Sequence, residues 1–457
     1  MSAEGKVTAC RQPISSPCWP ESSGSASGPP CPTSSVGDTD GRSTCSNRNH
    51  PAPTREAPRP APDRRARAGG PVRLATFSSL YPNAAQPNHG VFVENRLRHL
   101  LASGEAVAKV IAPVPWWPGR GPSRAAVPHE EQRHGIHVLH PRFIAVPGLG
   151  LATNPRAMAR AGLAAFSDLA RSGFDFDLID AHYLFPDGVA AVRIARALGK
   201  PVVLTARGSD TSQLPDLPFA GRMIRKALAE ADGIIAVSAG LAEGLVALGV
   251  PRDRIVVLRN GVDTALFRPP EARAALRVEL HMDGPTILSV GHLIERKRHH
   301  LAIEALRHLP GYRLVILGEG PERAALEALA ARLGVQDRLR MPGARPHREL
   351  PRWYGAADVM LLASAREGWA NVLLESMACG TPVVCTEAWG AREAVSTEAA
   401  GRVVVDADPR AIAAAVAALP GTAEARAATR AHAEQFGWEA TTQGQLALFR
   451  HILETRR

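Results

Sequence analysis

The sequence predicts an α/β protein made of two facing, doubly wound domains of the Rossmann type. One reason is length, because 457 residues exceed what a single hydrophobic core usually fills. The other is that short aliphatic runs alternate with helical segments in two successive series, which is typical of parallel sheets with helical crossovers. The composition, 45% hydrophobic and 21% charged, is ordinary for a globular protein.

Two series of candidate strands define the predicted domains. The first series comprises residues 72–77, 107–111, 177–180, 201–205, 233–237 and 255–258. The second series comprises residues 286–290, 313–317, 338–341, 358–363 and 382–385. We expect an N-terminal domain at 71–264, a C-terminal domain at 265–432 and a helix at 433–457 that returns to the first domain. Ligands of such sheets gather at the carboxyl ends of the strands, so two facing domains predict a cleft between them.

Residues 1–70 are rich in serine, proline and glycine and predict a disordered extension. Four of the six cysteines lie there, without the C-x2-C pairs that are typical of zinc sites. The start lacks the basic and apolar regions of a secretory signal, and no run of about 18 uncharged apolar residues follows. We therefore expect a cytoplasmic protein without a membrane-spanning helix.

Because the net charge is +10, nucleic acid and anionic membranes are candidate partners. Few aromatic residues interleave with the scattered arginines, and no known nucleic-acid module is present, so we expect no nucleic-acid partner. Arg222, Arg225 and Lys226 lie beside apolar residues in a segment that predicts an amphipathic helix. Peripheral contact with an anionic membrane and an ordinary surface helix are both compatible with this pattern.

The most informative segment spans residues 364–384. Its apolar strand candidate leads into a glycine-bearing turn at Gly368 and then into a helix, and Glu367 and Glu375 stand eight residues apart around the start of that helix. Backbone N–H groups at a helix start favour phosphate, and carboxylates favour hydroxyl groups. The segment therefore predicts a site for a phosphorylated polyol.

With this spacing and the Gly380-Thr381-Pro382 sequel, the segment resembles the E-x7-E signature of family-4 retaining glycosyltransferases, over roughly residues 71–457. The resemblance implies the GT-B fold, with the nucleotide sugar on the C-terminal domain and the acceptor on the N-terminal one. It also implies that Glu375 binds ribose hydroxyls, that Glu367 binds the donor sugar, and that backbone amides near Asn371, Val372 and Leu373 contact phosphate. Gly368 is a further expected residue of the donor site.

A basic run follows the strand candidate at 286–290. Within it, Arg296 and Lys297 can hold a diphosphate and stabilise the charge that develops as it leaves. We count Lys297, Arg296 and Glu367 as candidate catalytic residues. Relatives usually carry arginine at the position of His292. The remaining expected donor-site residues are Gly291, His292, Gly318 and Gly320.

The first domain supplies four candidates for an acceptor or phosphate loop. Gly90 lies in a glycine-containing loop between a strand and a helix, where the backbone can approach a ligand. His182, Arg207 and Asp210 lie at predicted strand ends. Many relatives carry histidine where Arg207 stands.

The sequence thus predicts an enzyme that moves a hexosyl group, from a UDP sugar by default, to a hydroxyl acceptor that can be lipid-linked. The resemblance implies retention of configuration and no metal or other cofactor, since His292, His299 and His300 do not form a metal set. Cell-surface polysaccharide or glycolipid synthesis would suit such an enzyme. The alternatives are a nucleotide-sugar-binding protein with decayed catalysis, a nucleotide-sugar epimerase and a phosphorylase.

Overall fold

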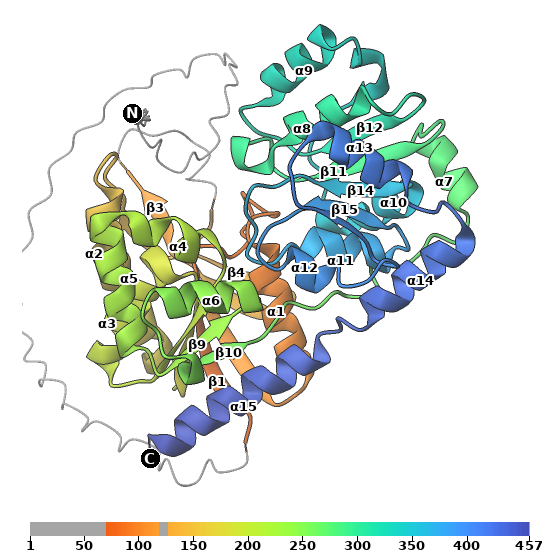
Figure 1. Ribbon diagram of the computed structural model, residues 1–457. Coiled ribbons are helices and arrows are strands. Elements are labelled where there is room, and N and C mark those ends of the chain that lie inside the picture. The colour runs from red at the N-terminus through yellow and green to blue at the C-terminus, as the bar shows by residue number, and fades with distance from the viewer. Residues whose placement is uncertain (1–69, 118–126, 457) are drawn as a thin grey trace, which may run out of the picture. The chain divides into compact units, whose positions relative to one another are not determined.

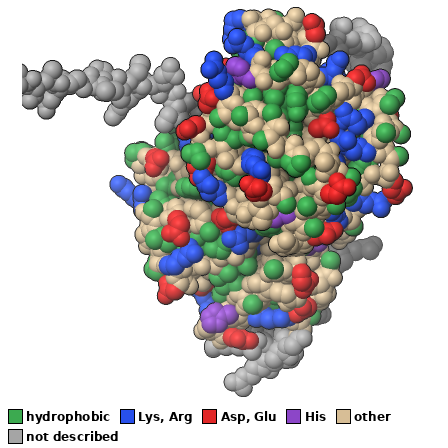
Figure 2. Space-filling view, turned by 45° about the vertical axis from the view of Figure 1, so that its right-hand side comes forward, with side chains coloured by type: hydrophobic (Ala, Val, Ile, Leu, Met, Phe, Trp, Pro, Cys, Tyr) green, Lys and Arg blue, Asp and Glu red, His purple; other side chains and the backbone are tan. Residues whose placement is uncertain are grey.

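The computed structural model describes residues 70–117 and 127–456, which form two large sheets with helices on both faces (Figure 1). The predicted extension at 1–70, with its four cysteines, lies outside the described residues except for Gly70. On the face shown in Figure 2, acidic and basic side chains are interspersed over the surface.

The first sheet has eight strands in the order β10-β9-β8-β7-β1-β2-β5-β4. All neighbours are parallel except β4 and β5, which pair antiparallel. Its strands are β1 (Val72–Phe77), β2 (Ala106–Ile111), β4 (Glu130–Arg133), β5 (Ile136–Leu139), β7 (Leu178–His182), β8 (Val202–Ala206), β9 (Gly233–Ala236) and β10 (Ile255–Val257). A separate parallel pair is formed by β3 (Val114–Trp116) and β6 (Arg142–Ile144).

The second sheet has six strands, all parallel, in the order β13-β12-β11-β14-β15-β16. They are β11 (Thr286–Val290), β12 (Arg313–Leu317), β13 (Leu339–Arg340), β14 (Val359–Leu362), β15 (Val383–Thr386) and β16 (Gly401–Val404). Strand order reverses beside β11 and β14, so the loops after these two strands meet where ligands bind in doubly wound sheets.

The helices of the first half of the chain are α1 (Val91–Ala102), α2 (Gly150–Arg171), α3 (Val189–Leu198), α4 (Ser209–Ser212), α5 (Pro218–Glu230) and α6 (Ala239–Ala247). Those of the second half are α7 (Arg273–Glu279), α8 (His299–Leu306), α9 (Arg323–Arg332), α10 (Leu350–Ala356), α11 (Asn371–Ala378), α12 (Ala391–Ala394), α13 (Pro409–Ala417), α14 (Ala423–Glu434) and α15 (Glu439–Thr455). One-turn segments comprise a π-helix at Leu184–Gly188 and 3-10 helices at Leu214–Asp216, Arg252–Arg254, Glu295–Lys297, Gln336–Arg338 and His347–Glu349.

Alternation along each strand divides the apolar side chains between two faces of a sheet. In β11, Ile287 packs with α8, α9 and α13, whereas Leu288 packs with α10 and α11. In β1, Leu74 packs with α1 and α15, whereas Phe77 packs with α2 and α3. Near-continuous apolar strands are therefore buried on both sides, as expected for parallel sheets.

Helix α15 returns from the second half of the chain to the first sheet. Its Leu446 and Phe449 are fully buried and lie in one cluster with Leu74 of β1 and Val93 of α1. Arg450 of the same helix forms an ion pair with Glu105. The last helix thus completes the core of the first sheet.

The candidate strands are confirmed in both series, with ends that shift by one or two residues. Five strands were not predicted: β3, β4, β5, β6 and β16. The sequence Glu-Glu-Gln-Arg of β4 is almost wholly charged and polar, and it forms the edge of its sheet, where a strand needs little apolar surface. The predicted amphipathic helix is confirmed as α5, on which Arg222, Arg225 and Lys226 are exposed.

Candidate functional site

Ion pairs connect the loop after β11 with the loop after β14. Lys297 Nζ lies 2.6 Å from Glu367 Oε1, and Arg296 Nη1 lies 3.8 Å from Glu367 Oε2. The backbones also meet, because Ala365 N donates to the carbonyl of Arg296 at 2.9 Å and Arg296 Nη1 donates to the carbonyl of Arg366 at 3.0 Å. The three candidate catalytic residues therefore lie together at the carboxyl edge of the second sheet.

Glu367 is held as a carboxylate by its neighbours. Burial alone would raise its pKa, but the charges of Lys297 and Arg296 outweigh burial, and the pKa lies below its usual value. Lys297 is about as enclosed as its partner, with side-chain exposures of 14% and 12%. An ammonium group has three N–H donors, so its bond to Glu367 leaves donors for phosphate oxygens.

Arg298, the third cation of this run, bonds mainly to backbone carbonyls and does not pair with Glu367. Its guanidinium donates to the carbonyls of Ala363 at 2.7 Å and Ser364 at 3.0 Å and to Thr386 Oγ1 at 3.1 Å. It thereby fixes the loop that carries Glu367. The basic run alone did not distinguish this structural arginine from Arg296.

Glu375, eight residues after Glu367, is buried on α11 and engaged at both oxygens. His347 Nε2 lies 2.9 Å from Oε1, and Tyr354 Oη donates to Oε2 at 3.1 Å. Burial would lower the pKa of His347, but the bond and the charge of Glu375 raise it above the usual value. Phe267 packs edge-on against His347 with 5.1 Å between ring centroids. His347 and Tyr354 were missed by the sequence analysis, since neither is part of a recognisable motif.

The N-terminus of α11 lies among polar partners. Asn371 Oδ1 accepts from Asn260 Nδ2 at 3.2 Å, and Trp369 Nε1 donates to the carbonyl of Asn260 at 3.0 Å. The amide of Leu373 already donates to the carbonyl of Ala370 at 3.0 Å, inside the first helical turn. Val372, the next helical residue after Asn371, is half-buried.

Gly291, Gly318 and Gly320 lie where β11 and β12 end. The amide of Gly291 donates to the carbonyl of Leu317 at 3.0 Å, and the two glycine-containing turns continue side by side. Burial and the charge of Lys297 lower the pKa of His292, which lies in the same turn. A neutral imidazole thus stands beside Lys297 in this turn.

On the first sheet, His182 and Arg207 contact each other at the ends of β7 and β8. Arg207 Nη2 lies 2.7 Å from His182 Nδ1, and His182 Nε2 lies 3.2 Å from Asp180 Oδ2. Asp210 instead accepts from three backbone amides, those of Leu184, Arg207 and Gly208. Its role in the structure is to cap these loops.

Gly90 heads α1 with a φ of +67°, a left-handed conformation that favours glycine. A β-carbon there would lie 1.5 Å from the carbonyl oxygen of Leu80, so its backbone contacts the preceding loop.

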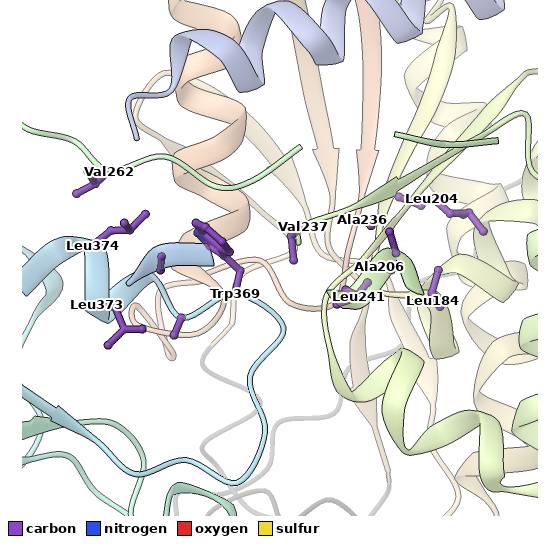
Figure 3. Packing of buried hydrophobic residues seen from close by; sticks show 14 of the residues in the cluster. Leu184, Leu204, Ala206, Ala236, Val237, Leu241, Val262, Trp369, Leu373 and Leu374 are labelled. Atoms are coloured by element: carbon purple, nitrogen blue, oxygen red, sulfur yellow. The ribbon is translucent and has the colours of Figure 1, made fainter. Parts of the chain in front are cut away.

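Gly368 lies where a loop of the second sheet closely approaches a loop of the first. A β-carbon on Gly368 would lie 1.9 Å from the carbonyl oxygen of Arg207. Figure 3 labels residues of the apolar cluster around this contact, with Trp369 and Leu374 on one side and Val237 and Leu241 on the other. The loops carrying Arg207 and Glu367 are therefore in direct contact.

Within residues 70–117 and 127–456, no group of three or more histidine, cysteine, aspartate or glutamate residues is arranged to hold a metal ion. Over the same residues, every helix is too short or too polar to span a bilayer.

Two family models match the chain in succession. "Glycosyltransferase Family 4" matches residues 89–266, and "Glycosyl transferases group 1" matches residues 274–436. A D-inositol 3-phosphate glycosyltransferase of Xylanimonas cellulosilytica is 34% identical, with 74% of this chain and 87% of that protein covered. The chain belongs to glycosyltransferase family 4. TuaC of Bacillus subtilis, a glycosyltransferase assigned to teichuronic acid biosynthesis, is 27% identical, with 70% and 82% covered.

Solved structures confirm the GT-B fold of this glycosyltransferase. The sucrose-phosphate synthase of Thermosynechococcus elongatus superposes with a TM-score of 0.68 at 20% identity, covering 84% of this chain and 100% of that one. Anabaena HepE in complex with UDP superposes with a TM-score of 0.63 at 21% identity, covering 82% and 98%. The fold and the family predicted from the sequence are thus both confirmed.

Proposed function

We propose that this glycosyltransferase moves a hexosyl group from a nucleotide sugar, UDP-linked in the first instance, to a hydroxyl group of its acceptor with retention of configuration. The observation that carries the proposal is the convergence of Lys297, Arg296 and Glu367 beside the start of α11, whose next turn carries Glu375. Two cations and a helix N-terminus suit a diphosphate, and the flanking carboxylates suit sugar hydroxyls.

In the proposed reaction the bond between the anomeric carbon and the diphosphate oxygen breaks, and a bond from the acceptor oxygen forms on the same face. The acceptor proton passes to an oxygen of the departing phosphate. Lys297 and Arg296 stabilise the leaving diphosphate as its negative charge grows. Glu367, kept ionised by these cations, accepts hydrogen bonds from the donor sugar. Because both positive charges come from side chains, we propose that no metal or other cofactor is needed.

Glu375 binds the ribose in this proposal. Its oxygens are oriented by His347 and Tyr354, and each oxygen keeps a further lone pair for a ribose hydroxyl. Gly291, Gly318, Gly320 and His292 line the nucleotide side. HepE was solved with UDP, which supports testing UDP sugars first.

The acceptor side is formed by the first sheet, around His182 and Arg207. Relatives are named for inositol 3-phosphate and for teichuronic acid, so hydroxyl acceptors of cell-envelope polysaccharide or glycolipid synthesis are the class we propose. The exposed cations Arg222, Arg225 and Lys226 on α5, with Phe219 at 72% exposure, support peripheral contact with an anionic membrane at its cytoplasmic face.

The test is a binding and turnover screen of the purified full-length chain. We expect UDP and a UDP sugar to bind saturably in calorimetry, with affinity unchanged by EDTA, and UDP release to rise when D-inositol 3-phosphate or a lipid-linked saccharide is added. NMR of the product should show the anomeric configuration of the donor. Binding of nucleotide sugars without turnover for any acceptor would favour the binding-protein alternative, and an inverted product would refute retention.

A further inference from the structure

One buried residue between the two sheets bonds with both halves of the candidate site. Asn260, at 3% exposure, follows β10 in the segment that leads to the second sheet. Its side-chain oxygen accepts from Arg96 Nη1 and from Arg207 Nη1, both at 3.2 Å. Its amide nitrogen donates to Asn371 Oδ1, also at 3.2 Å. One carboxamide thus bonds with three partners, on α1, on α11 and in the loop after β8.

These bonds complete a continuous path through the molecule. On the acceptor side, Arg207 contacts His182, which in turn contacts Asp180 of β7. On the donor side, Asn371 is the first residue of α11, the helix that carries Glu375. Among the described residues, the chain of side-chain bonds from Asp180 to Asn371 runs through Asn260.

The chemistry at this point requires a carboxamide. Two guanidinium groups need a hydrogen-bond acceptor, and the side-chain oxygen of Asn371 needs a donor. An asparagine side chain supplies both, the acceptor with its oxygen and the donor with its nitrogen. Both guanidinium groups are buried away from water, and this burial lowers the pKa of Arg96 to about 10 and that of Arg207 to about 9. An aliphatic residue would leave them without this acceptor, at a cost in stability.

The backbone reinforces the same connection. Gly368 lies so close to Arg207 that a β-carbon would meet its carbonyl oxygen at 1.9 Å, and Trp369 donates to the carbonyl of Asn260 at 3.0 Å. The loop that bears Glu367 is therefore braced against the loop that bears Arg207. Asn260 bonds to residues on both sides of this contact.

We propose that Asn260 is a positioning residue that couples the acceptor side of the site to the donor side, by holding Arg207 and Asn371 in one hydrogen-bonded arrangement. The inference rests on the proposed glycosyl transfer and deepens it. In this proposal Asn260 acts through Arg207 and Asn371, not by its own contact with the sugar or the diphosphate. Its bonds align the two substrates for reaction, so they contribute to turnover rather than to donor affinity.

The test compares Asn260→Ala, Asn371→Ala and the double variant. Thr441→Val is the matched control, because Thr441 is buried and donates to the carbonyl of Arg259, next to Asn260. Among the described residues, its side chain makes no hydrogen bond with α11. For each protein, UDP affinity is measured by calorimetry, turnover by UDP release with the donor and acceptor that the wild type uses, and Tm by thermal denaturation.

We expect kcat to fall about five- to tenfold in Asn371→Ala, as for loss of one hydrogen bond, and at least as far in Asn260→Ala, which also loses the bonds to Arg96 and Arg207. UDP affinity should stay within about twofold of wild type in both. The double variant should be no slower than the slower single variant by more than about twofold, since both remove the same bond. Thr441→Val should lower Tm and leave kcat unchanged. If Asn260→Ala does not fold, Asn371→Ala decides, because it removes the same bond from a half-buried position.

Three results would overturn the coupling: wild-type kcat in Asn371→Ala, effects that multiply in the double variant, or an equal loss of kcat in Thr441→Val. A loss of UDP affinity in Asn371→Ala would instead make Asn371 a donor contact and would also overturn it. If the wild type releases no UDP with any acceptor, the proposed function fails and the coupling fails with it. Wild-type turnover with unaffected variants would refute the coupling alone.

Discussion

Replacing Lys297 with alanine separates binding from catalysis at the second sheet. The substitution removes the 2.6 Å ion pair with Glu367 and leaves Arg296, 3.8 Å away, as the remaining partner of that carboxylate. In the proposed reaction it also removes a cation from the leaving diphosphate. The two losses act on different quantities, stability and turnover.

The magnitude of each loss follows from the surroundings. Removing one partner of a buried ion pair costs about 3–5 kcal/mol, and Glu367 keeps Arg296 and is 12% exposed, so the loss of stability should lie at or below the lower limit of that range. Removing one group that stabilises developing negative charge costs about 100- to 1000-fold in rate. We therefore expect kcat to fall by at least about 100-fold, while UDP affinity falls much less.

The assay is UDP release under saturating donor and acceptor, with calorimetry for UDP binding and thermal denaturation for stability. Lys200→Ala is the matched control, because Lys200 is 17% exposed and pairs with Asp175 at 2.9 Å on the first sheet. It should lose some stability and keep wild-type kcat. Activity of Lys297→Ala should also decline toward acidic pH more than that of wild type, because burial raises the pKa of Glu367 and one of the two cations that oppose this is then gone.

A kcat for Lys297→Ala within about threefold of wild type would refute the role of Lys297 in stabilising the leaving group. A loss of UDP affinity as large as the loss of kcat would show that the cation serves ground-state binding instead.

Glu375→Ala should weaken UDP binding by about tenfold or more, as for lost charge-assisted hydrogen bonds, and unchanged affinity in calorimetry would argue against the ribose contact. His347→Gln should lower Tm most near pH 6 and progressively less at higher pH. The pKa of His347 is higher in the folded than in the unfolded protein, so its contribution to stability is present below the unfolded pKa and is lost as pH rises through the folded pKa. A Tm difference that does not depend on pH would contradict this. Gly368→Ala should reduce kcat by about tenfold or more, since its β-carbon would meet the carbonyl of Arg207. Gly437→Ala is the control, because the space around its new β-carbon is open, and it should behave as wild type. Equal kcat in the two variants would refute the need for close contact between the loops.

The parallel strands could be predicted because each is a continuous apolar run, and the position of the site could be predicted because strand ends in such sheets share one edge. The spacing of Glu367 and Glu375 predicted that the second carboxylate lies on the helix, and it is buried there. The edge strand Glu130–Arg133 could not be predicted, since its sequence lacks the apolar pattern of a strand and its pairing supplies the stability.

The partners of the site residues could not be read from local sequence. Asn260 is not among the site residues expected from the sequence, yet its bonds reach across 53 residues to Arg207 and 111 residues to Asn371. His347 lies 28 residues from Glu375, at the start of a short 3-10 helix without a distinctive motif. Such contacts are set by how the helices and sheets pack, which no periodicity in the chain encodes.

The return of α15 to the first sheet has a consequence for biosynthesis. Gln445 of this helix accepts a hydrogen bond from Arg96 across 349 residues, and Phe449 fills the same core as Leu74. At about 5–20 residues per second, a ribosome needs about 20 to 70 seconds to make the intervening chain. Throughout that time the α1 side of the sheet lacks the cover that α15 supplies, so the nascent N-terminal half exposes apolar surface that chaperones can bind and that favours aggregation. Folding of the first domain is completed only when the last helix leaves the ribosome.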